Sequence, residues 1–292
     1  MKIKINPKVS IIMNCHNGEK YLKESIYSVL NQTYKNWELI FFDNFSSDAS
    51  KKIFFTFKDK RLKYFSSKTK LNLYNARNLA IKQASGKFIS FLDTDDLWLK
   101  DKLDSQIKFI KKEKSKFIYT NYYILKKNTK KLFSNKKLPE GFITQKLLNF
   151  YFISIPTVIF EKKIITKMKV KFDKNYNIIG DFDFFLELSK MIKFHYIHKP
   201  LSIYRIHENN YSKIYNQNYS KEMKYWLNKK KNNFKNYNLK TFKLDVNYME
   251  IKSLIYNKNY FVAFKKFLKF PNKIKKLKLF ILFFLPKKFF VF

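Results

Sequence analysis

The chain has 292 residues, of which 46% are hydrophobic, including 33 Phe and 20 Tyr. This composition supports one large α/β domain, or one domain with an appendage. It excludes global disorder, a collagen-like repeat and a small disulfide-bonded scaffold. The single cysteine, Cys15, excludes an intrachain disulfide and a cysteine-based zinc site. The longest strictly apolar run, residues 279–285, is far shorter than the roughly 20 residues of a membrane-spanning helix.

The net charge is +39, from 61 basic and 22 acidic residues. Only three of the basic residues are Arg, namely Arg61, Arg77 and Arg205. Nucleic-acid recognition favours the planar fork of Arg, so we expect no nucleic-acid partner and attribute most of the Lys excess to compositional bias. The charge still attracts the protein to anionic surfaces. Because this composition avoids Arg and Gly, each of those that remains is a candidate functional residue.

Apolar stretches alternate with helical patterns over the first 125 residues. Strands are predicted at residues 9–14, 37–42, 62–65, 88–92 and 117–125. Helices are predicted between them, and Gly86 is expected to stop the helix over residues 73–84. Strands that alternate with helices form right-handed crossovers. The sequence therefore predicts an α/β fold with a mostly parallel, twisted, Rossmann-like sheet and flanking helices.

The second half of the chain differs in the order and composition of its predicted elements. Its predicted elements are a basic hairpin or loop at 126–137, a strand at 156–160, a helix at 181–191 and two short strands around Pro200 within 194–204. Beyond about residue 212 the patterns become helical and rich in Lys, Asn and Tyr. Residues 273–292 form a basic amphipathic segment.

Polar segments follow three of the predicted strands, at residues 14–18, 43–48 and 93–96. Ligands of open parallel sheets bind at the carboxyl ends of the strands, so these segments are candidates for a single site. Asp43 either forms a turn with Asn44 or accepts a hydrogen bond from a base or ribose.

The segment Asp93-Thr94-Asp95-Asp96 places three carboxylates within four residues. Their mutual repulsion requires compensation, which a hard divalent cation such as Mg²⁺ or Mn²⁺ would supply through oxygen ligands. The alternative is that these acids cap and begin the following helix.

Three further groups are candidates for chemistry. Arg77 lies within a predicted helix and is either a surface residue or a partner of a nucleotide diphosphate. Asp181 and Asp183 open a helix, where they either cap it or supply a general base. Arg205 and His207 are two residues apart in a strand, so their side chains lie on one face. Two nitrogen donors on one face suit a diphosphate or a metal ion.

Together these segments resemble the family 2 glycosyltransferases, which have the A-type nucleotide-sugar-binding fold. The resemblance is close over residues 8–112, returns at 181–188 and 204–212, and disappears after about residue 215. It is carried, in order and spacing, by Val9-Ser-Ile-Ile, Asn17, Tyr21-Leu22, Glu24-Ser25-Ile26, Ser28 to Tyr34, Trp37-Glu-Leu-Ile, Asp43-Asn44, Ala76-Arg77-Asn78, Ala80, Gly86 and Leu92 to Trp98.

The resemblance implies transfer of a hexosyl or N-acetylhexosaminyl group from a nucleotide-diphosphate sugar, with Mn²⁺ or Mg²⁺ as cofactor and inversion at the anomeric carbon. A UDP-sugar is the expected donor. By position, the nucleotide sugar would be bound by Asn14, His16, Asp43, Arg77, Asp93 and Arg205, the metal ion by Asp95 and His207, and the acceptor proton by Asp181, with Asp183 as the next recurrent acid.

Four positions depart from the family pattern. Asn14 replaces the usual Pro and His16 replaces an aromatic residue, both where the backbone touches the base. Asn72 stands where Gly is common, which Asn tolerates because it visits left-handed conformations. Gly180 replaces the usual Glu, so any task of that Glu would fall to Asp183.

The resemblance implies a nucleotide-sugar-binding half (1–112) and an acceptor-binding half of the same domain (113–215). The helical patterns beyond them predict a Lys- and aromatic-rich helical region (216–292). The expected acceptor is a glycan or lipid-linked hydroxyl, in cell-surface polysaccharide or lipooligosaccharide synthesis. The expected location is cytoplasmic, with the basic amphipathic segment bound peripherally to the anionic inner face of a bacterial plasma membrane. The alternative is that this segment packs on the catalytic domain.

Two other classes of protein remain open at this point. A nucleotidyl- or phosphotransferase on a similar α/β sheet would account for the acidic cluster, although the sequence has no Gly-rich phosphate loop. A non-enzymatic protein that binds nucleic acid or membranes would account for the Lys excess. Hydrolysis of a sugar nucleotide distinguishes the glycosyltransferase from both.

Overall fold

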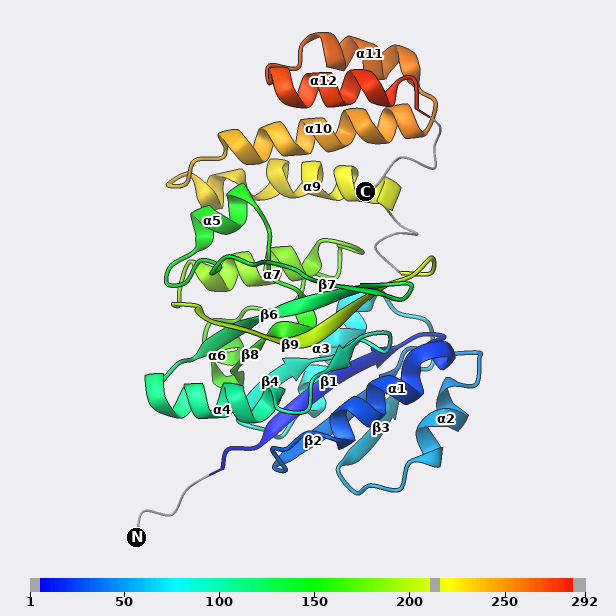
Figure 1. Cartoon of the computed structure of the whole chain (residues 1–292), viewed down its shortest axis with the longest axis vertical. Helices are drawn as coiled ribbons and strands as arrows, with labels where there is room; N and C mark the ends of the chain where they lie inside the picture. The colour runs from blue at the N-terminus through cyan, green and yellow to red at the C-terminus, as the bar shows by residue number, and fades with distance from the viewer. Residues whose placement is uncertain (1–5, 211–215, 286–292) are drawn as a thin grey trace. The chain divides into compact units, whose positions relative to one another are not determined.

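The computed structural model describes residues 6–210 and 216–285. The chain divides into two compact units, both of which are drawn in Figure 1. The N-terminal unit comprises Met1–Thr144 and Phe152–His207. The C-terminal unit comprises Gln145–Tyr151 and Glu208–Phe292.

The N-terminal unit begins with four parallel strands in the spatial order β3-β2-β1-β4. Its first elements are β1 (Val9–Cys15), α1 (Glu19–Leu30), β2 (Trp37–Asp43), α2 (Ser50–Thr56), β3 (Leu62–Ser66), α3 (Leu73–Gln83) and β4 (Phe88–Phe91). Strands β1, β2 and β4 are buried along their whole length, as expected of apolar runs in a sheet that is covered on both faces. The carboxyl ends of these strands therefore meet at one edge of the sheet.

The second half of the sheet mixes parallel and antiparallel pairs. The elements that follow along the chain in this unit are β5 (Leu97–Trp98), α4 (Lys102–Glu113), β6 (Phe117–Lys126), β7 (Thr129–Leu132), a 3₁₀ turn (Ile155–Thr157), β8 (Ile159–Glu161), α6 (Lys162–Lys167), α7 (Gly180–Ser189) and β9 (His195–Ile206). Helix α5 (Thr144–Asn149) falls almost wholly within the C-terminal unit. Strand β8 lies antiparallel between β4 and β6, β9 runs parallel to β6, and β5 runs antiparallel to β9. The predicted α/β fold with flanking helices is confirmed, and its parallel part is concentrated in the first half (Figure 1).

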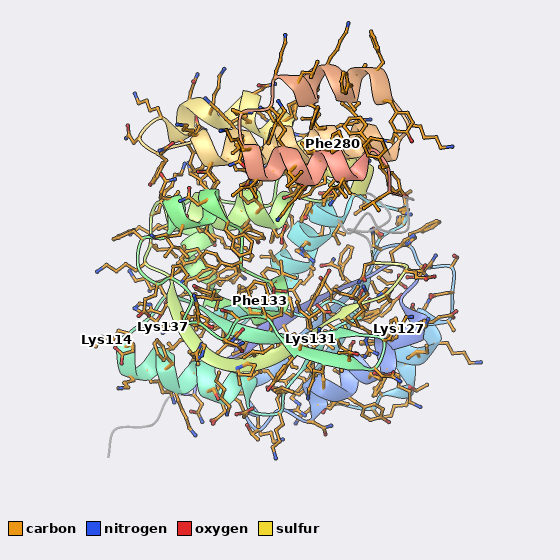
Figure 2. All side chains as sticks on the ribbon, turned by 45° about the horizontal axis from the view of Figure 1, so that its top comes forward. Lys114, Lys127, Lys131, Phe133, Lys137 and Phe280 are labelled. Carbon is orange, nitrogen blue, oxygen red and sulfur yellow. The ribbon has the colours of Figure 1, made fainter. Side chains whose placement is uncertain are left out.

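The basic segment at 126–137 forms the expected hairpin. Strand β7 pairs antiparallel with β6, and the turn between them contains Lys127, whose φ is 52°. Figure 2 marks Lys127 and Lys131 on this hairpin. The ring of Phe133 stacks on that of Tyr122, with 4.4 Å between the ring centroids, and so fastens the returning strand to the sheet.

The prediction that Gly86 stops α3 is wrong. The last residue of the helix is Gln83, the following residue Ala84 has an extended conformation, and Gly86 does not have a positive φ. A Cβ atom at residue 86 would lie 2.7 Å from the backbone nitrogen of Ser10. Glycine is therefore required at this position because the backbone passes directly against β1, rather than because of helix capping.

Two other local predictions also fail. Pro200 does not separate two strands, because it lies within β9 at a shift of register opposite Asn121, and this irregularity accommodates the missing N–H group. Asn72 is not left-handed: its φ and ψ are −59° and 143°, and its side chain caps α3 by accepting a hydrogen bond from the N–H of Tyr74.

The C-terminal unit is helical, as predicted. Its helices after α5 are α9 (Asn216–Lys230), a 3₁₀ turn (Lys231–Phe234), α10 (Lys240–Tyr256), α11 (Tyr260–Leu268) and α12 (Lys273–Leu282). One cluster of rings joins α9 to α10 through Trp226, Phe234 and Phe242. A second cluster packs α11 and α12 on α10 around Ile255 and Phe267. Within residues 6–210 and 216–285, no helix is both long and apolar enough to cross a membrane.

Candidate active site

The acidic segment Asp93–Asp96 forms a turn directly after β4. Asp96 is buried, and its Oδ1 accepts a hydrogen bond from the N–H of Arg205 at 2.9 Å. Burial, and then the charges of Asp95 and Asp93, raise the pKa of Asp96 well above its ordinary value. Asp96 therefore secures the turn to β9, while Asp93 and Asp95 remain partly exposed.

Helix α3 brings Arg77 to this turn. The guanidinium group is buried, and its Nη2 donates a hydrogen bond to Oδ1 of Asp93 at 2.8 Å. The rings of Tyr74, Phe91 and Phe172 surround it at 5.5–5.7 Å. Burial raises the pKa of Asp93, and the charge of Arg77 opposes this shift. Arg77 is therefore a fixed cation within the site and not a surface residue.

The end of β9 carries Arg205 and His207 onto the same turn. Arg205 Nε donates to the carbonyl oxygen of Asp95 at 3.0 Å, and Nε2 of His207 lies 2.9 Å from Oδ2 of Asp95. Both side chains also lie against the ring of Tyr21, at 4.3 Å and 4.9 Å from its centroid. The alternation predicted from the sequence thus brings both side chains to Asp95, where Arg205 binds the backbone carbonyl oxygen and His207 meets the carboxylate.

Helix α1 braces the turn through a polar stripe that sequence reasoning missed. The hydroxyl group of Ser25 lies 2.7 Å from the carbonyl oxygens of both Thr94 and Asp96. Glu24 forms an ion pair with Arg205 at 2.6 Å, and Gln32 donates to the carbonyl oxygen of Leu99. The available signal was the spacing of Tyr21, Ser25 and Ser28, which places three polar side chains on one face of α1, with Gln32 just beyond the end of the helix.

Asn14, His16 and Asp43 lie at the adjoining ends of β1 and β2. Asp43 is buried and completes a turn, because its carboxylate accepts hydrogen bonds from the N–H of Ser46 and from the hydroxyl group of Tyr64. His16 Nδ1 lies 3.1 Å from the carbonyl oxygen of Asn44. Both amide atoms of Asn14 are buried without a hydrogen-bond partner among the residues that the structure describes.

Gly18 explains how the loop after β1 reaches the acidic turn. A Cβ atom at this position would lie 2.9 Å from Oγ1 of Thr94 and 3.1 Å from Sγ of Cys15. The absence of a side chain therefore lets the two loops touch. Burial raises the pKa of the neighbouring Cys15 to about 11, which makes its thiol unreactive at neutral pH.

Helix α7 places Asp181 and Asp183 in different surroundings. Asp183 is buried, at 2% exposed, whereas Asp181 is partly exposed in the first turn. The hydroxyl group of Tyr74 lies 3.5 Å from Oδ1 of Asp181, and Tyr74 also contacts Arg77. Asp181 is thus joined to the acidic turn through Tyr74 and Arg77, and it is the more accessible of the two acids.

A metal ion suits one pair of donors. Within the described ranges, no three His, Cys, Asp or Glu side chains converge closely enough to hold a metal unaided. Asp95 and His207 place an oxygen and a nitrogen atom 2.9 Å apart. Adjacent ligands of one octahedral ion, each at about 2.1 Å, are about 3 Å apart. Oδ2 of Asp95 and Nε2 of His207 contact one another directly, and their spacing is also that of two adjacent ligands of a Mn²⁺ or Mg²⁺ ion, whose remaining positions would fall to phosphate oxygens and water.

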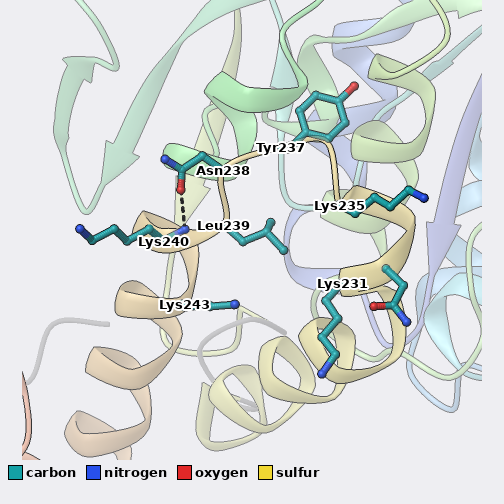
Figure 3. Close-up of a pocket in the computed structure, with 8 residues that line it drawn as sticks. Lys231, Lys235, Tyr237, Asn238, Leu239, Lys240 and Lys243 are labelled. Carbon is teal, nitrogen blue, oxygen red and sulfur yellow. Dashed lines mark hydrogen bonds between the residues drawn. The ribbon is translucent and has the colours of Figure 1, made fainter.

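A pocket in the C-terminal unit contains none of these residues. It has a volume of about 540 Å³ and is lined by residues 231–243. Figure 3 shows it at the start of α10, where Oδ1 of Asn238 accepts a hydrogen bond from the N–H of Lys240. The candidate site of the N-terminal unit is thus defined by its polar contacts and not by this pocket.

Comparison with known proteins identifies relatives of the N-terminal unit. Residues 10–172 match the family model described as "Glycosyl transferase family 2". An uncharacterized glycosyltransferase of Haemophilus influenzae is 36% identical over 206 residues, covering 68% of this chain and 80% of that protein. The Escherichia coli protein WfgD is a "UDP-Glc:alpha-D-GlcNAc-diphosphoundecaprenol beta-1,3-glucosyltransferase". It is 38% identical over 164 residues, which are 56% of this chain but only 64% of WfgD.

Solved structures show the same fold. A crystal structure of Staphylococcus aureus TarS 1-349 in complex with UDP-GlcNAc has a TM-score of 0.64 at 19% identity, covering 85% of this chain and 71% of that one. The mannosyltransferase PcManGT from Pyrobaculum calidifontis, in complex with GDP-Man and Mn²⁺, has a TM-score of 0.53 at 12% identity, covering 88% and 65%. The family match over more than half of the chain, together with this fold, shows that the protein belongs to glycosyl transferase family 2.

Proposed function

We propose that the protein is an inverting glycosyltransferase that moves a hexosyl or N-acetylhexosaminyl group from a UDP-sugar to an acceptor hydroxyl group. The observation that carries this proposal is the convergence of Arg77, Arg205 and His207 on the Asp93–Asp96 turn. Fixed cations beside partly exposed carboxylates suit a diphosphate bound together with a divalent cation. WfgD uses UDP-Glc by its name, and TarS structures contain UDP and UDP-GlcNAc, which supports a UDP donor.

The nucleotide is assigned to the ends of β1, β2 and β4. An unsatisfied amide is costly to bury, and hydrogen bonds from a bound base would satisfy the side chain of Asn14. His16 borders the same position, and the carboxylate of Asp43 retains lone pairs beyond the two hydrogen bonds it already accepts. Asp93 would contact the ribose, and Arg77 and Arg205 the diphosphate.

Asp95 and His207 would hold Mn²⁺ or Mg²⁺. The bound ion would stabilise the negative charge that develops on the departing diphosphate. Arg77 is suited to the same electrostatic role, because burial holds its cation in place before the reaction begins.

Asp181 is proposed as the general base. It would accept the proton of the acceptor hydroxyl group while that oxygen bonds to the anomeric carbon and the bond from this carbon to the diphosphate oxygen breaks. The electron pair of the broken bond leaves with UDP. A single displacement from the face opposite UDP converts an α-linked donor into a β-linked product. Asp183 is less suited to contact an acceptor because its side chain is buried.

The proposed acceptor is a glycan or a lipid-linked sugar of cell-surface polysaccharide or lipooligosaccharide synthesis. WfgD acts, by its name, on a sugar linked through diphosphate to undecaprenol. An acceptor of this kind is held at a membrane. We therefore place the protein in the cytoplasm, associated peripherally with the inner face of the bacterial plasma membrane.

A donor screen tests the proposed function. Thermal shift and UDP release are measured with UDP-, GDP- and dTDP-sugars, in the presence of Mn²⁺ or Mg²⁺ and again with a chelator. We expect UDP-sugars to stabilise the protein with the metal ion and slow hydrolysis to release UDP. Stabilisation by GDP-sugars alone would refute the assignment of the base, and an absence of any response to sugar nucleotides would refute the proposed function.

A further inference from the structure

We propose that the hairpin of α11 and α12 is the surface by which this protein binds an anionic lipid bilayer, with both helices lying in the interface. The proposal rests on the peripheral location proposed above and identifies its structural basis. It does not depend on the identity of the donor or on the catalytic residues.

The hairpin buries one face and exposes another. Ala263, Phe267 and Leu279 pack into the cluster shared with α10. The opposite faces carry large apolar side chains, of which Phe261, Ile274 and Phe284 are 71%, 72% and 73% exposed. The other exposed members of this surface are Phe264, Leu268, Leu277, Phe280 and Ile281. A soluble surface rarely gathers so many apolar side chains on two adjacent short helices unless it meets a partner.

The exposed side chains of the two helices form one continuous patch. The rings of Phe264 and Phe280 both contact the buried ring of Phe267, at centroid distances of 6.0 Å and 6.3 Å. Phe280 also contacts Phe284 at 5.2 Å, and Figure 2 marks Phe280 on α12. Phe264 contacts Phe283 at 6.2 Å, which fixes the antiparallel register of the helices. The apolar surface therefore extends across both helices.

Lysines border this patch and give it one sign of charge. From residue 251 to residue 292 the sequence contains eleven Lys and no Asp or Glu. Lys265, Lys269, Lys273 and Lys278 are exposed. Nζ of Lys265 lies 4.2 Å from the centroid of the Phe261 ring, so this charge lies directly against the exposed apolar surface in a cation–π contact. Apolar side chains bordered by lysines are the pattern of a helix that lies in the interface of an anionic membrane.

Other occupants fit this surface less well. In a symmetric dimer the same patch would face itself, which would bring its lysines opposite one another. A nucleic acid would pair with the charges, but it would leave the aliphatic side chains of Ile274, Leu277 and Ile281 against a hydrated phosphate backbone. No Arg occurs after Arg205. An anionic bilayer can bind both parts of this surface, because its acyl chains contact the apolar side chains while its headgroups pair with the lysines.

Vesicle flotation of the full chain tests the proposal. The probes are phosphatidylcholine vesicles with and without phosphatidylglycerol, and two triple variants of the hairpin. The apolar variant carries Ile274→Gln, Leu277→Gln and Phe280→Gln, and the basic variant carries Lys265→Gln, Lys273→Gln and Lys278→Gln. All six side chains are exposed, so both variants are expected to fold. The matched control removes the same charge from α4, through Lys108→Gln, Lys111→Gln and Lys112→Gln.

We expect the wild-type chain and the α4 control to float with anionic vesicles. The loss of three interfacial lysines should weaken binding by about 100-fold, at about five-fold per lysine. The apolar variant should lose at least roughly ten-fold per side chain. All variants should retain hydrolysis of the donor in solution, which separates this test from that of the proposed function. Equal losses in the basic variant and the α4 control would show that overall charge is responsible and would overturn the proposal.

Two further outcomes would overturn it. The first is that the full chain stays in the soluble fraction at low salt. The second is that the wild-type chain forms an oligomer that does not bind vesicles, and that the apolar variant is a monomer. Placement in the interface is measured with a polarity-sensitive dye on Leu277→Cys, because the native Cys15 is buried. The dye emission should shift to the blue on anionic vesicles, and the same dye on Lys112→Cys should not respond. An equal response at both positions would contradict the proposed orientation.

Discussion

The ring of Tyr74 occupies the space in which any other residue at position 180 would place its Cβ atom. That atom would lie 2.5 Å from two carbons of the ring. Tyr74 is held in place because its hydroxyl group donates to the carbonyl oxygen of Ile178 at 2.7 Å. The same ring contacts both Arg77 and Asp181. The glycine therefore allows the start of α7 to pack closely against Tyr74, which itself contacts the arginine that binds the acidic turn.

Gly180→Ala should destabilise the protein, although Gly180 is the first residue of α7. Helix propensity alone favours Ala over Gly by about 1 kcal/mol. Overpacking against the ring should outweigh that gain and cost about 1–3 kcal/mol of unfolding free energy. Urea unfolding measures whether the unfolding free energy falls or rises. In a Tyr74→Ala background, Gly180→Ala should lower the unfolding free energy by a smaller amount. A stabilised Gly180→Ala variant would show that the ring moves aside.

Asp181→Asn should bind the donor normally and lose about 10²–10⁴-fold in transfer rate, because it removes the proton acceptor at nearly constant shape. Donor affinity and the rate of transfer to acceptor are measured separately. The control is Asp183→Asn, in which the altered side chain is buried and the expected loss is in thermal stability. Normal transfer by Asp181→Asn together with inactive but folded Asp183→Asn would assign the base to Asp183.

Ser25→Ala should loosen the acidic turn. The substitution removes the hydroxyl group that lies 2.7 Å from two backbone carbonyl oxygens, and a lost buried hydrogen bond costs about 1–3 kcal/mol. We expect a higher KM for the donor with a smaller change in kcat at saturation. Ser25→Thr, which keeps the hydroxyl group, should recover part of the affinity. An unchanged KM in Ser25→Ala would show that Arg205 and Asp96 hold the turn without help from α1.

Glu38 should make stability depend on pH. Burial opposes its ionisation, but hydrogen bonds from Lys63, Ser10 and Lys8 and from the Ser85 N–H outweigh this effect and hold the pKa of Glu38 well below its usual value. A lowered pKa in the folded state stabilises the protein above the unfolded value of about 4.3, and this contribution is lost as pH falls further. The Glu38→Gln variant has no carboxylate at this position and therefore lacks this stabilising contribution at every pH. The gap in unfolding free energy between the two proteins should therefore narrow from pH 7 to about pH 3.5; a constant gap would contradict the prediction.

The order of the elements and the parts of the site that follow strands could be predicted from the sequence. Apolar runs and their polar ends are local signals, and the spacing of Arg205 and His207 indicated that they share one face. That both would meet the segment containing Asp95 was implied by the family resemblance and not by the spacing. One feature of the fold depended on a distant contact. The need for Gly86 comes from the backbone at Ser10, which a single sequence does not bring into view.

The strand β9 was divided in the prediction because Pro usually ends a strand. The register of the β6–β9 pair shifts on both sides of Asn121, the residue of β6 that lies opposite Pro200, and the regular pairing resumes after it. The bracing by α1 was missed for a different reason. Ser25 is a buried polar residue on a helix whose apolar pattern already accounted for its burial, and Gln32 follows the end of that helix. Their partners Thr94, Asp96 and Leu99 lie 67 to 71 residues away in the chain.

The release of UDP from a UDP-sugar by the wild-type chain and by Asp95→Ala, each with Mn²⁺ and with a chelator, tests the central claim most directly. We predict that the wild type releases UDP only with the metal ion, and that Asp95→Ala stays folded and releases none under either condition. Metal-independent release that is unchanged in Asp95→Ala would contradict the account, because the acidic turn would then play no part in the departure of the diphosphate.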